Sequence, residues 1–291
     1  MAEPVSIRSE RLTALISPFG AELTSLIDDE DRQLMSDGDP AYWTGHAPLL
    51  FPIVGRLSGD TLRLDATCFE MEKHGFARKT AFDLIESRPD MAQFRLIDSA
   101  ATRAQYPFSF QLDVVFTVQD LSLHMSVTVH NPANTDLPFS FGFHPAFAWP
   151  LPFGGARTDH QICFAHEEPE PLRAINGSGL ITGYVPSPVN GRTFMLKDGL
   201  FECDALVWDK IASHGLSYGV PGRPRLAIEF PDTDYLGIWT KPGAAFVCIE
   251  PWAGIADDAG FIGSFTEKRG VEILSPKMSR RFQMKVSIED T

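Results

Sequence analysis

The amino-acid sequence predicts an all-β protein with the architecture of a large antiparallel β-sandwich. Short segments rich in β-branched and aromatic residues alternate with turn residues about every eight to twelve positions. No helical periodicity of useful length interrupts this pattern. The 23 glycines and 22 prolines are spread along the chain, which suits a fold with many turns. We therefore expect residues 1–291 to form a single domain of this kind.

The clearest strand pattern lies at residues 111–130, on either side of a turn at Asp120. Apolar side chains there occupy every second position: Leu112, Val114, Phe116 and Val118 before the turn, and Leu123, Met125, Val127 and Val129 after it. Successive side chains of a strand point to opposite faces of the sheet. The alternation therefore predicts an antiparallel hairpin with one buried and one polar face.

Further strands follow from shorter patterns of the same kind. Residues 5–29 predict two or more strands around a turn at residues 17–20. Residues 61–98 predict several short strands, and residues 225–230 and 235–240 predict one strand each.

Other segments predict irregular structure. Two prolines within the apolar run at residues 48–56 argue against a central strand there. Residues 150–203 are rich in proline and glycine, so we expect long loops. Residues 271–289 predict a final pair of strands around Ser275-Pro276-Lys277.

The charge balance excludes several classes of partner. The formal net charge is −13 and no run of lysine or arginine is present, so nucleic acids and anionic membranes are unfavourable partners. The four cysteines are far apart without a CxxC pair, which indicates a reducing compartment. The first ten residues carry charges where a signal peptide needs an apolar core. We expect a cytoplasmic protein, while its oligomeric state stays open.

Two strand-end segments carry candidate acid–base residues. Glu250 follows the apolar residues 245–249, and Pro251 and Gly254 are expected to end that strand. His144 lies in a similar setting within residues 139–147. A carboxylate among apolar neighbours needs a partner or a raised pKa. A nearby carboxylate, in turn, would help to keep an imidazole protonated. Glu250 and His144 are thus a plausible proton-transfer pair.

Motifs for other chemistries are absent. The sequence has no HExxH, no Cys/His cluster at ligand spacing and no calcium-binding loop, so we expect no metal. It also lacks phosphate-binding glycine loops and a GxSxG turn, so we expect no nucleotide cofactor. What remains is a cofactor-free site of Glu, His, Arg and aromatic residues, which suits a sugar substrate.

Four blocks together resemble one family. In chain order they are PLLFPIVGR at 48–56, HGFAR at 74–78, GFHPAF at 142–147 and CIEPWAGIAD at 248–257. They resemble the aldose 1-epimerase (galactose mutarotase-like) family, most closely its LacX-like bacterial branch. The resemblance implies a large antiparallel sandwich and an isomerase that interconverts the α and β anomers of a free hexose without a cofactor.

The resemblance also implies roles for individual residues. Glu250 would be the general base at the C1 hydroxyl, and His144 the general acid at the ring oxygen. His74 would polarise the same oxygen.

The resemblance further implies residues that bind the substrate. Arg56 would bind sugar hydroxyls, together with an aspartate for which Asp204 is a better match than Asp209. Trp252 is equally compatible with a core position or a platform for the sugar ring.

Three alternatives stay open. The substrate could be a hexose 6-phosphate, for which Arg78, with Lys73 and Lys79 beside it, is the local candidate for binding the phosphate. The protein could instead be a non-catalytic carbohydrate-binding sandwich. It could also be a glycoside hydrolase, with Asp204 or Asp257 as the second carboxylate.

Overall fold

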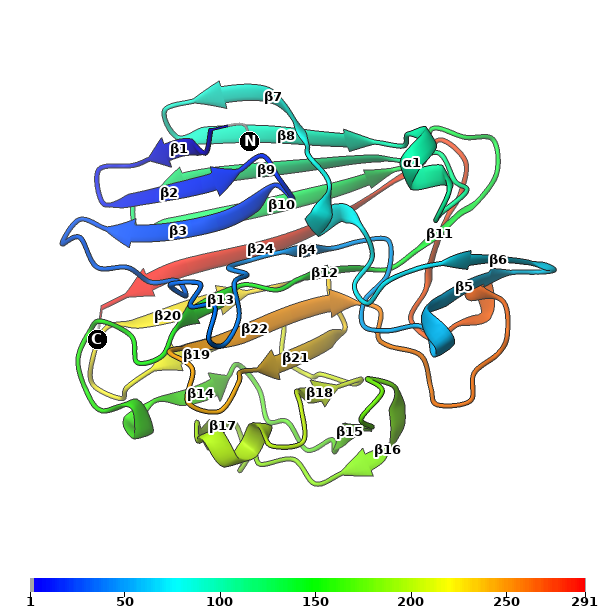
Figure 1. The fold of residues 1–291 in the computed structure, drawn as a ribbon. Coiled ribbons are helices and arrows are strands. Elements are labelled where there is room, and N and C mark those ends of the chain that lie inside the picture. The colour runs from blue at the N-terminus through cyan, green and yellow to red at the C-terminus, as the bar shows by residue number, and fades with distance from the viewer. Residues whose placement is uncertain (1–2, 291) are drawn as a thin grey trace.

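A computed structural model describes residues 3–290 of the chain. Its largest sheet has nine antiparallel strands in the order β17-β14-β19-β20-β24-β10-β9-β8-β7 (Figure 1). Their bounds are β17 Thr193–Met195, β14 Gln161–Phe164, β19 Gly215–Gly219, β20 Arg225–Glu229, β24 Ser279–Glu289, β10 Ser122–His130, β9 Gln111–Gln119, β8 Met91–Ile97 and β7 Asp83–Arg88.

A second sheet has eight strands in the order β16-β15-β18-β21-β22-β12-β4, with β13 also paired to β22. Their bounds are β16 Ile181–Val185, β15 Leu172–Ile175, β18 Leu206–Trp208, β21 Tyr235–Trp239, β22 Phe246–Ala253, β12 Phe141–Phe143, β4 Leu49–Leu50 and β13 Ala146–Ala148. A separate three-stranded sheet consists of β1 Val5–Arg8, β2 Leu12–Ser17 and β3 Glu22–Asp28.

Smaller elements complete the fold. Two further strand pairs are β5 Thr61–Leu64 with β6 Thr67–Glu70, and β11 Leu137–Phe139 with β23 Glu272–Leu274. The one α-helical element among residues 3–290 is α1, Ala100–Arg103, and short 3₁₀ turns occur at Ser58–Asp60, Ala77–Lys79, Arg157–Asp159, Asp198–Phe201 and Phe265–Glu267. No helix in this range has the length and apolar character needed to cross a membrane.

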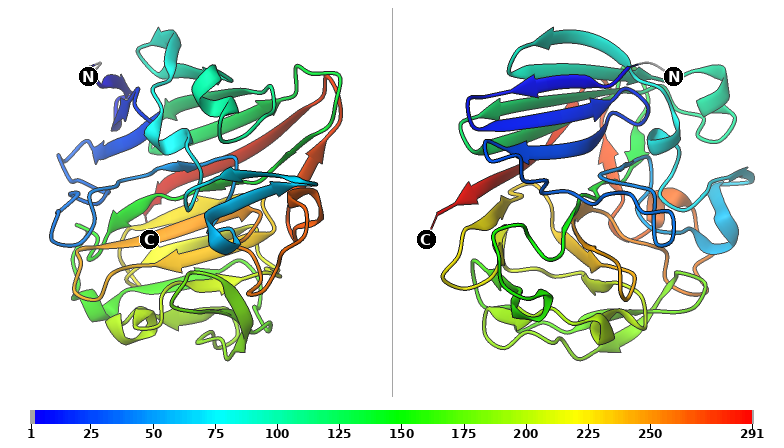
Figure 2. Two further views of the ribbon diagram at one scale, coloured as in Figure 1. Left: turned by 45° about the vertical axis from the view of Figure 1, so that its right-hand side comes forward. Right: turned by 60° about the vertical axis from the view of Figure 1, so that its left-hand side comes forward.

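The sheets pack face to face around a shared apolar core. The three-stranded sheet lies against β8, β9 and β10, and the eight-stranded sheet covers the other half of the nine-stranded one (Figures 1 and 2). Phe141 of β12 stacks on Phe282 of β24 with ring centroids 4.9 Å apart, and Phe164 of β14 contacts Trp208 of β18 at 5.5 Å. One connected cluster of buried side chains runs through these layers. The predicted antiparallel β-sandwich is confirmed.

The hairpin predicted at residues 111–130 is present as β9 and β10. Its register pairs Val118 with Leu123 and Leu112 with Val129, so the predicted apolar face is the buried one. The strands predicted within residues 5–29, 61–98, 225–230 and 235–240 are present as well.

The expectation of long loops at residues 150–203 was wrong. Residues 150–203 are not only loops, because β14, β15, β16 and β17 lie among their glycines and prolines. Each of these strands has only three to five residues, too few for a visible alternation. The two strands predicted within residues 271–289 are present as β23 and β24. They pair with other strands and not with each other, because β23 pairs with β11 and β24 lies between β10 and β20.

Candidate active site

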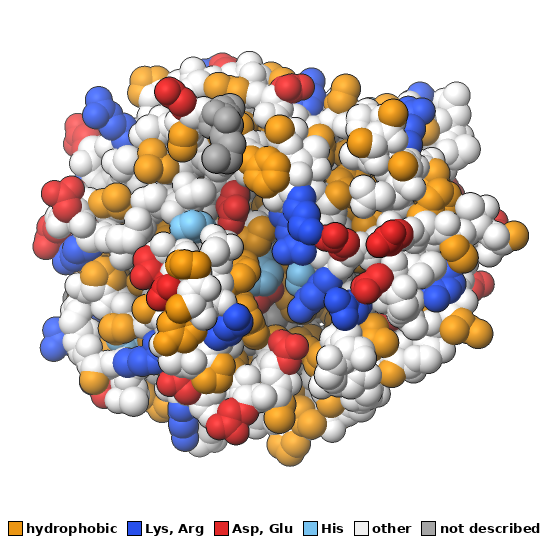
Figure 3. Space-filling view, viewed as in Figure 1, with side chains coloured by type: hydrophobic (Ala, Val, Ile, Leu, Met, Phe, Trp, Pro, Cys, Tyr) orange, Lys and Arg blue, Asp and Glu red, His pale blue; other side chains and the backbone are white. Residues whose placement is uncertain are grey.

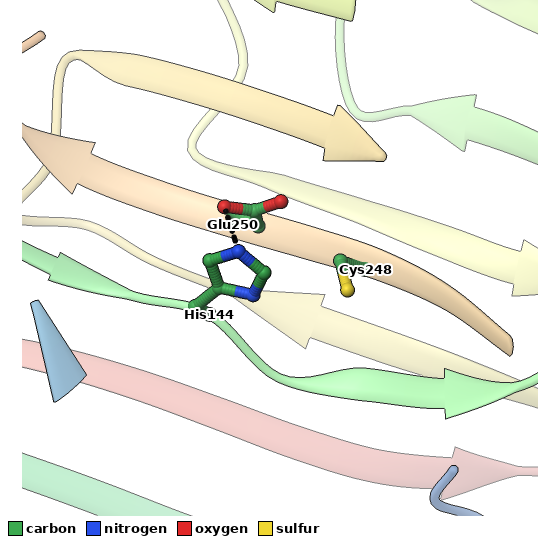
Figure 4. Close-up of side chains that lie close together, drawn as sticks. All are labelled: His144, Cys248 and Glu250. Atoms are coloured by element: carbon green, nitrogen blue, oxygen red, sulfur yellow. Dashed lines mark ion pairs between the residues drawn. The ribbon is translucent and has the colours of Figure 1, made fainter. Parts of the chain in front are cut away.

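Glu250 lies in the middle of the eight-stranded sheet, where a break in a neighbouring strand brings His144 beside it. On one side of β22, Glu250 is opposite Gly237 of β21. On the other side, β13 pairs with residues 246–248 and β12 with residues 252–253. His144 lies in the link between β12 and β13, so its side chain meets Glu250 at this break (Figure 4).

The same break explains why β22 continues through Pro251, which was expected to end it. The N–H of Ile249 donates to the carbonyl of Pro145, 3.1 Å away, on the side of β12 and β13. Nitrogens two residues apart in a strand face the same side. The nitrogen of Pro251 therefore faces the break, where no ladder hydrogen bond is lost, and the strand runs to Ala253.

Glu250 and His144 form a buried pair. Nε2 of His144 lies 3.0 Å from Oε2 of Glu250, and both side chains are more than nine-tenths buried. Burial raises the pKa of Glu250 well above its usual value, which Asp204 reinforces, while Lys73 and the Trp252 indole oppose it. Burial, together with the charges of Lys73 and Arg78, lowers the pKa of His144 to about 3, although a backbone hydrogen bond opposes the shift. The raised pKa of Glu250 agrees with the sequence argument. His144 is not kept protonated, because desolvation lowers its pKa and the neutral form favoured for Glu250 carries no charge to oppose this.

His74 presents a fixed tautomer to the same site. Its Nδ1 accepts the N–H of Gly55 at 3.1 Å, so the neutral ring carries its proton on Nε2. Burial, followed by the charge of Lys73, holds the pKa of His74 well below its usual value, so the neutral ring is favoured. Its ring lies edge-on to that of His144, with centroids 5.7 Å apart.

The turn that carries His74 depends on a glycine. His74 and Gly75 have φ angles of +68° and +70°, in the left-handed region. A Cβ atom on Gly75 would lie 2.3 Å from the carbonyl oxygen of Phe51. The HG dipeptide therefore allows this turn to dock on the Phe51–Gly55 loop, which orients the imidazole.

The indole of Trp252 lies on the sheet and forms part of the cavity lining. Trp252 shares the face of Glu250, two residues further along β22. A Cβ on Gly142 would lie 2.5 Å from Cδ1 of this indole, and a Cβ on Gly237 would lie 2.4 Å from its six-membered ring. Two glycines on the strands flanking β22 thus leave room for the indole to extend across the sheet.

We expect Gly237→Ala to displace Trp252 and to lower the free energy of unfolding by about 1–3 kcal/mol, the usual cost of overpacking. Urea denaturation followed by tryptophan fluorescence measures this. Gly183→Ala in β16 is the matched control, because a Cβ there meets no atom within 4 Å. Equal stability of the two variants, with unchanged fluorescence, would show that Trp252 is not held in this way.

Two more tryptophans surround His144. The ring of Trp43 lies 5.1 Å from that of His144, and the ring of Trp239 lies 6.1 Å away. Both tryptophans also contact Phe246 and line the cavity. The sequence around them carries no signal for a site. Their rings help to desolvate His144.

The cavity has a volume of about 180 Å³. Three of its lining residues have buried polar atoms without a hydrogen-bonding partner among residues 3–290: Nε of Arg78, Nδ1 of His144 and Nε1 of Trp252. The Trp252 indole still favours the Glu250 anion, although it forms no hydrogen bond of ordinary geometry with it. Buried polar groups are normally paired. The lining is therefore suited to a ligand with several hydroxyl groups.

Most of the residues singled out in the sequence meet at this cavity. Glu250, His144, His74, Arg78 and Asp204 line it, together with Trp252. Lys73, considered only as a phosphate contact, also lines it. Ile175, Gly179 and Ile181 complete one wall, and the β15–β16 hairpin that carries them lies in the region expected to be loops.

Arg56, Asp209 and Lys79 do not line the cavity. Arg56 pairs with Asp60 at 3.0 Å and is 40% exposed. Asp209 binds Arg269 at 2.6 Å, which leaves Asp204 as the aspartate of the cavity wall.

Cys248 lies close to the acid–base pair. One potential ligand atom from each of His144, Cys248 and Glu250 lies within 4.8 Å of the other two (Figure 4). Burial, reinforced by Glu250, raises the pKa of the Cys248 thiol well above its usual value. Because metals bind the thiolate, this environment disfavours metal ligation by Cys248.

Known proteins match this chain in sequence and in structure. A model of the family described as aldose 1-epimerase matches residues 3–172. The chromosomal protein LacX of Lactococcus lactis subsp. lactis is 29% identical over 263 residues, which cover 87% of this chain and 88% of LacX.

Solved structures are similar over the whole chain. A galactose mutarotase related enzyme from Lactobacillus acidophilus has a TM-score of 0.91 and 27% identity, covering 99% of this chain and 98% of that one. A galactose mutarotase-like protein from Lactobacillus casei has a TM-score of 0.92 and 27% identity, covering 98% of this chain and all of that one.

Proposed function

Because this chain belongs to the aldose 1-epimerase family and is a carbohydrate epimerase, we propose that it interconverts the α and β anomers of a free hexose by acid–base ring opening. The observation that carries the proposal is the buried Glu250–His144 pair, 3.0 Å apart, in a cavity lined by unpartnered polar atoms. Ring opening needs one proton removed and another delivered on the same sugar, and this pair supplies one group for each transfer.

In the proposed reaction, Glu250 takes the proton of the C1 hydroxyl as the carbon–oxygen double bond forms. The bond between C1 and the ring oxygen breaks, and the ring oxygen takes the proton of His144. Rotation about the C1–C2 bond exposes the other face of the aldehyde. Closure then reverses both transfers, so that Glu250 and His144 regain their starting protonation.

The pair needs a single proton for this cycle. Before a sugar binds, Glu250 carries this proton, because burial raises the pKa of Glu250 and lowers that of His144. A sugar hydroxyl that donates to the carboxylate stabilises its anion and shifts the proton to His144. The Nε2–H of His74 supports the reaction by donating to the ring oxygen.

The other contacts to the sugar come from the cavity lining. Trp252 offers an apolar surface to the pyranose ring, and Asp204 accepts hydrogen bonds from its hydroxyls.

We expect a bell-shaped dependence of kcat/KM on pH, because only the pair with one proton is active. Activity falls in acid, when His144 is protonated while Glu250 keeps its own proton. It also falls in alkali, as pH rises through the raised pKa of Glu250. Anomer-exchange rates between about pH 2.5 and 9, corrected for the spontaneous reaction, measure this, because the fall in acid is expected near the His144 pKa of about 3. A rate that stays level towards alkaline pH would contradict a shared proton.

The direct test is polarimetry of freshly dissolved α-glucose and α-galactose with and without the protein. We expect the approach to anomeric equilibrium to accelerate in proportion to protein concentration. A protein that binds sugar but leaves mutarotation at the solvent rate would instead be a binding module. Hydrolysis of a chromogenic glycoside without mutarotation would indicate a glycosidase.

A further inference from the structure

Two cationic side chains line the cavity beside the acid–base pair. Lys73 and Arg78 both belong to its wall. Nη2 of Arg78 donates to the carbonyl of Lys73 at 2.9 Å, and Nε of Arg78 is buried without an acceptor. Within residues 3–290, no carboxylate lies within ion-pair distance of Lys73 and the ammonium forms no hydrogen bond. Figure 3 shows Lys and Arg side chains beside histidines at the centre of this face.

The nearby carboxylates do not neutralise these cations directly. Glu72 is paired with Lys79. Glu22 accepts the backbone N–H groups of His46 and Ala47, at 2.7 and 3.0 Å. In the cavity itself, burial favours the neutral form of Glu250, which leaves Asp204 as the acidic group of the wall. A protein of net charge −13 thus has a cavity with an excess of positive charge.

The position of these cations indicates which part of the sugar they face. Both lie on the histidine side of the cavity. Lys73 directly precedes His74, and Arg78 is held to the carbonyl of Lys73. The ring of His74 in turn lies 5.7 Å from that of His144. His144 is the group proposed to protonate the ring oxygen. That oxygen is bonded to C5, which carries C6, so a substituent on C6 lies on the His144 side of the bound sugar.

We propose that the substrate of this site is an aldose with an anionic group at C6, a phosphate or a carboxylate, held by Lys73 and Arg78. The inference rests on the proposed epimerase activity and replaces the unsubstituted hexose by an anionic sugar as its preferred substrate. A charge-assisted hydrogen bond of this kind is worth about 1.5–3 kcal/mol, roughly a 10- to 100-fold preference over the neutral sugar.

The experiment compares kcat/KM for glucose, glucose 6-phosphate and glucuronate, measured by exchange NMR of the anomeric protons. We expect the wild-type protein to prefer one or both anionic sugars by about 10- to 100-fold. The anionic sugar with the higher kcat/KM shows whether the site prefers a phosphate or a carboxylate. Lys73→Met should reduce the anionic-to-neutral ratio by about tenfold or more.

Lys79→Met is the matched control, because Lys79 is exposed, pairs with Glu72 and does not line the cavity. It should leave the anionic-to-neutral ratio unchanged, and thermal melting confirms that both variants fold. If Lys73→Met does not fold, titration of the wild-type protein with glucose 6-phosphate, glucuronate and glucose gives the preference from their Kd values.

Acceleration of glucose mutarotation without any preference for the anionic sugars would overturn this inference and leave the epimerase activity standing. An unchanged ratio in folded Lys73→Met would overturn the role of Lys73. If no sugar is turned over, the proposed function fails. The inference about the anionic group is then tested by binding alone. Equal Kd values for glucose, glucose 6-phosphate and glucuronate would overturn it.

Discussion

Glu250→Gln is expected to reduce the acceleration of anomer exchange by about 10²–10⁴-fold, the usual contribution of one positioned proton transfer. Glutamine has nearly the same shape as glutamate but cannot accept the proton of the C1 hydroxyl at any accessible pH. The fold should persist, because the buried carboxyl is already biased towards its neutral form. Exchange NMR with the best sugar measures the rate, and circular dichroism and thermal melting measure the fold.

Glu229→Gln is the control for this substitution. Glu229 is exposed on β20, where it forms an ion pair with Lys285 at 3.0 Å. Unlike Glu250, it is not a buried carboxyl group. Its replacement should leave the rate within about twofold of wild type, since surface substitutions of this kind are usually near neutral. A folded Glu250→Gln protein with wild-type activity would remove Glu250 as the base.

His144→Asn is expected to cause a loss of similar size, about 10²–10⁴-fold, because the ring oxygen then lacks its proton donor. The asparagine amide can still hydrogen-bond but does not exchange a proton near neutral pH. We expect the loss mainly in kcat, because the donor acts in the transition state and contributes little to ground-state binding.

His124→Asn, on the half-buried outer face of β10, provides the comparison for His144. This variant should retain activity, because His124 is absent from the cavity wall. If His144→Asn changes KM while kcat stays at the wild-type value, His144 positions the sugar and does not transfer a proton.

The sandwich could be predicted because strand alternation and turn residues are local signals. The spacing of the apolar residues between Leu112 and Val129 is enough to predict which face is buried, and the structure buries that face. The strands of residues 150–203 could not be predicted in this way. They are three to five residues long, and their pairing with distant strands such as β18 and β19 determines their structure.

The proposed catalytic residues were identified partly from chemistry and partly from family resemblance. A glutamate and a histidine at apolar strand ends indicated a pair, but their meeting depends on the break between β12 and β13, which no local pattern reveals. Trp43 joins the cavity from a loop, and Arg56 turns to Asp60. Contacts between distant segments decide where Glu250, His144 and Trp43 lie, whereas Arg56 is held by a carboxylate only four residues along the chain.

The pKa of His144 could not be predicted for a related reason. The sequence places a carboxylate nearby, which by itself raises an imidazole pKa. The structure adds the rings of Trp43 and Trp239, whose contribution to burial depends on tertiary packing. Desolvation lowers the pKa of His144 to about 3, and burial favours the neutral form of Glu250, which carries no charge to oppose this.

The rate of the double variant Glu250→Gln/His144→Asn, beside its two single variants, tests the shared proton transfer most directly. Residues that act as one unit give losses that do not add. We predict that the double variant retains about the same residual acceleration as either single variant, with all three proteins folded. Losses that multiply in full, so that each residue contributes independently, would contradict a mechanism in which one proton leaves the sugar as another arrives.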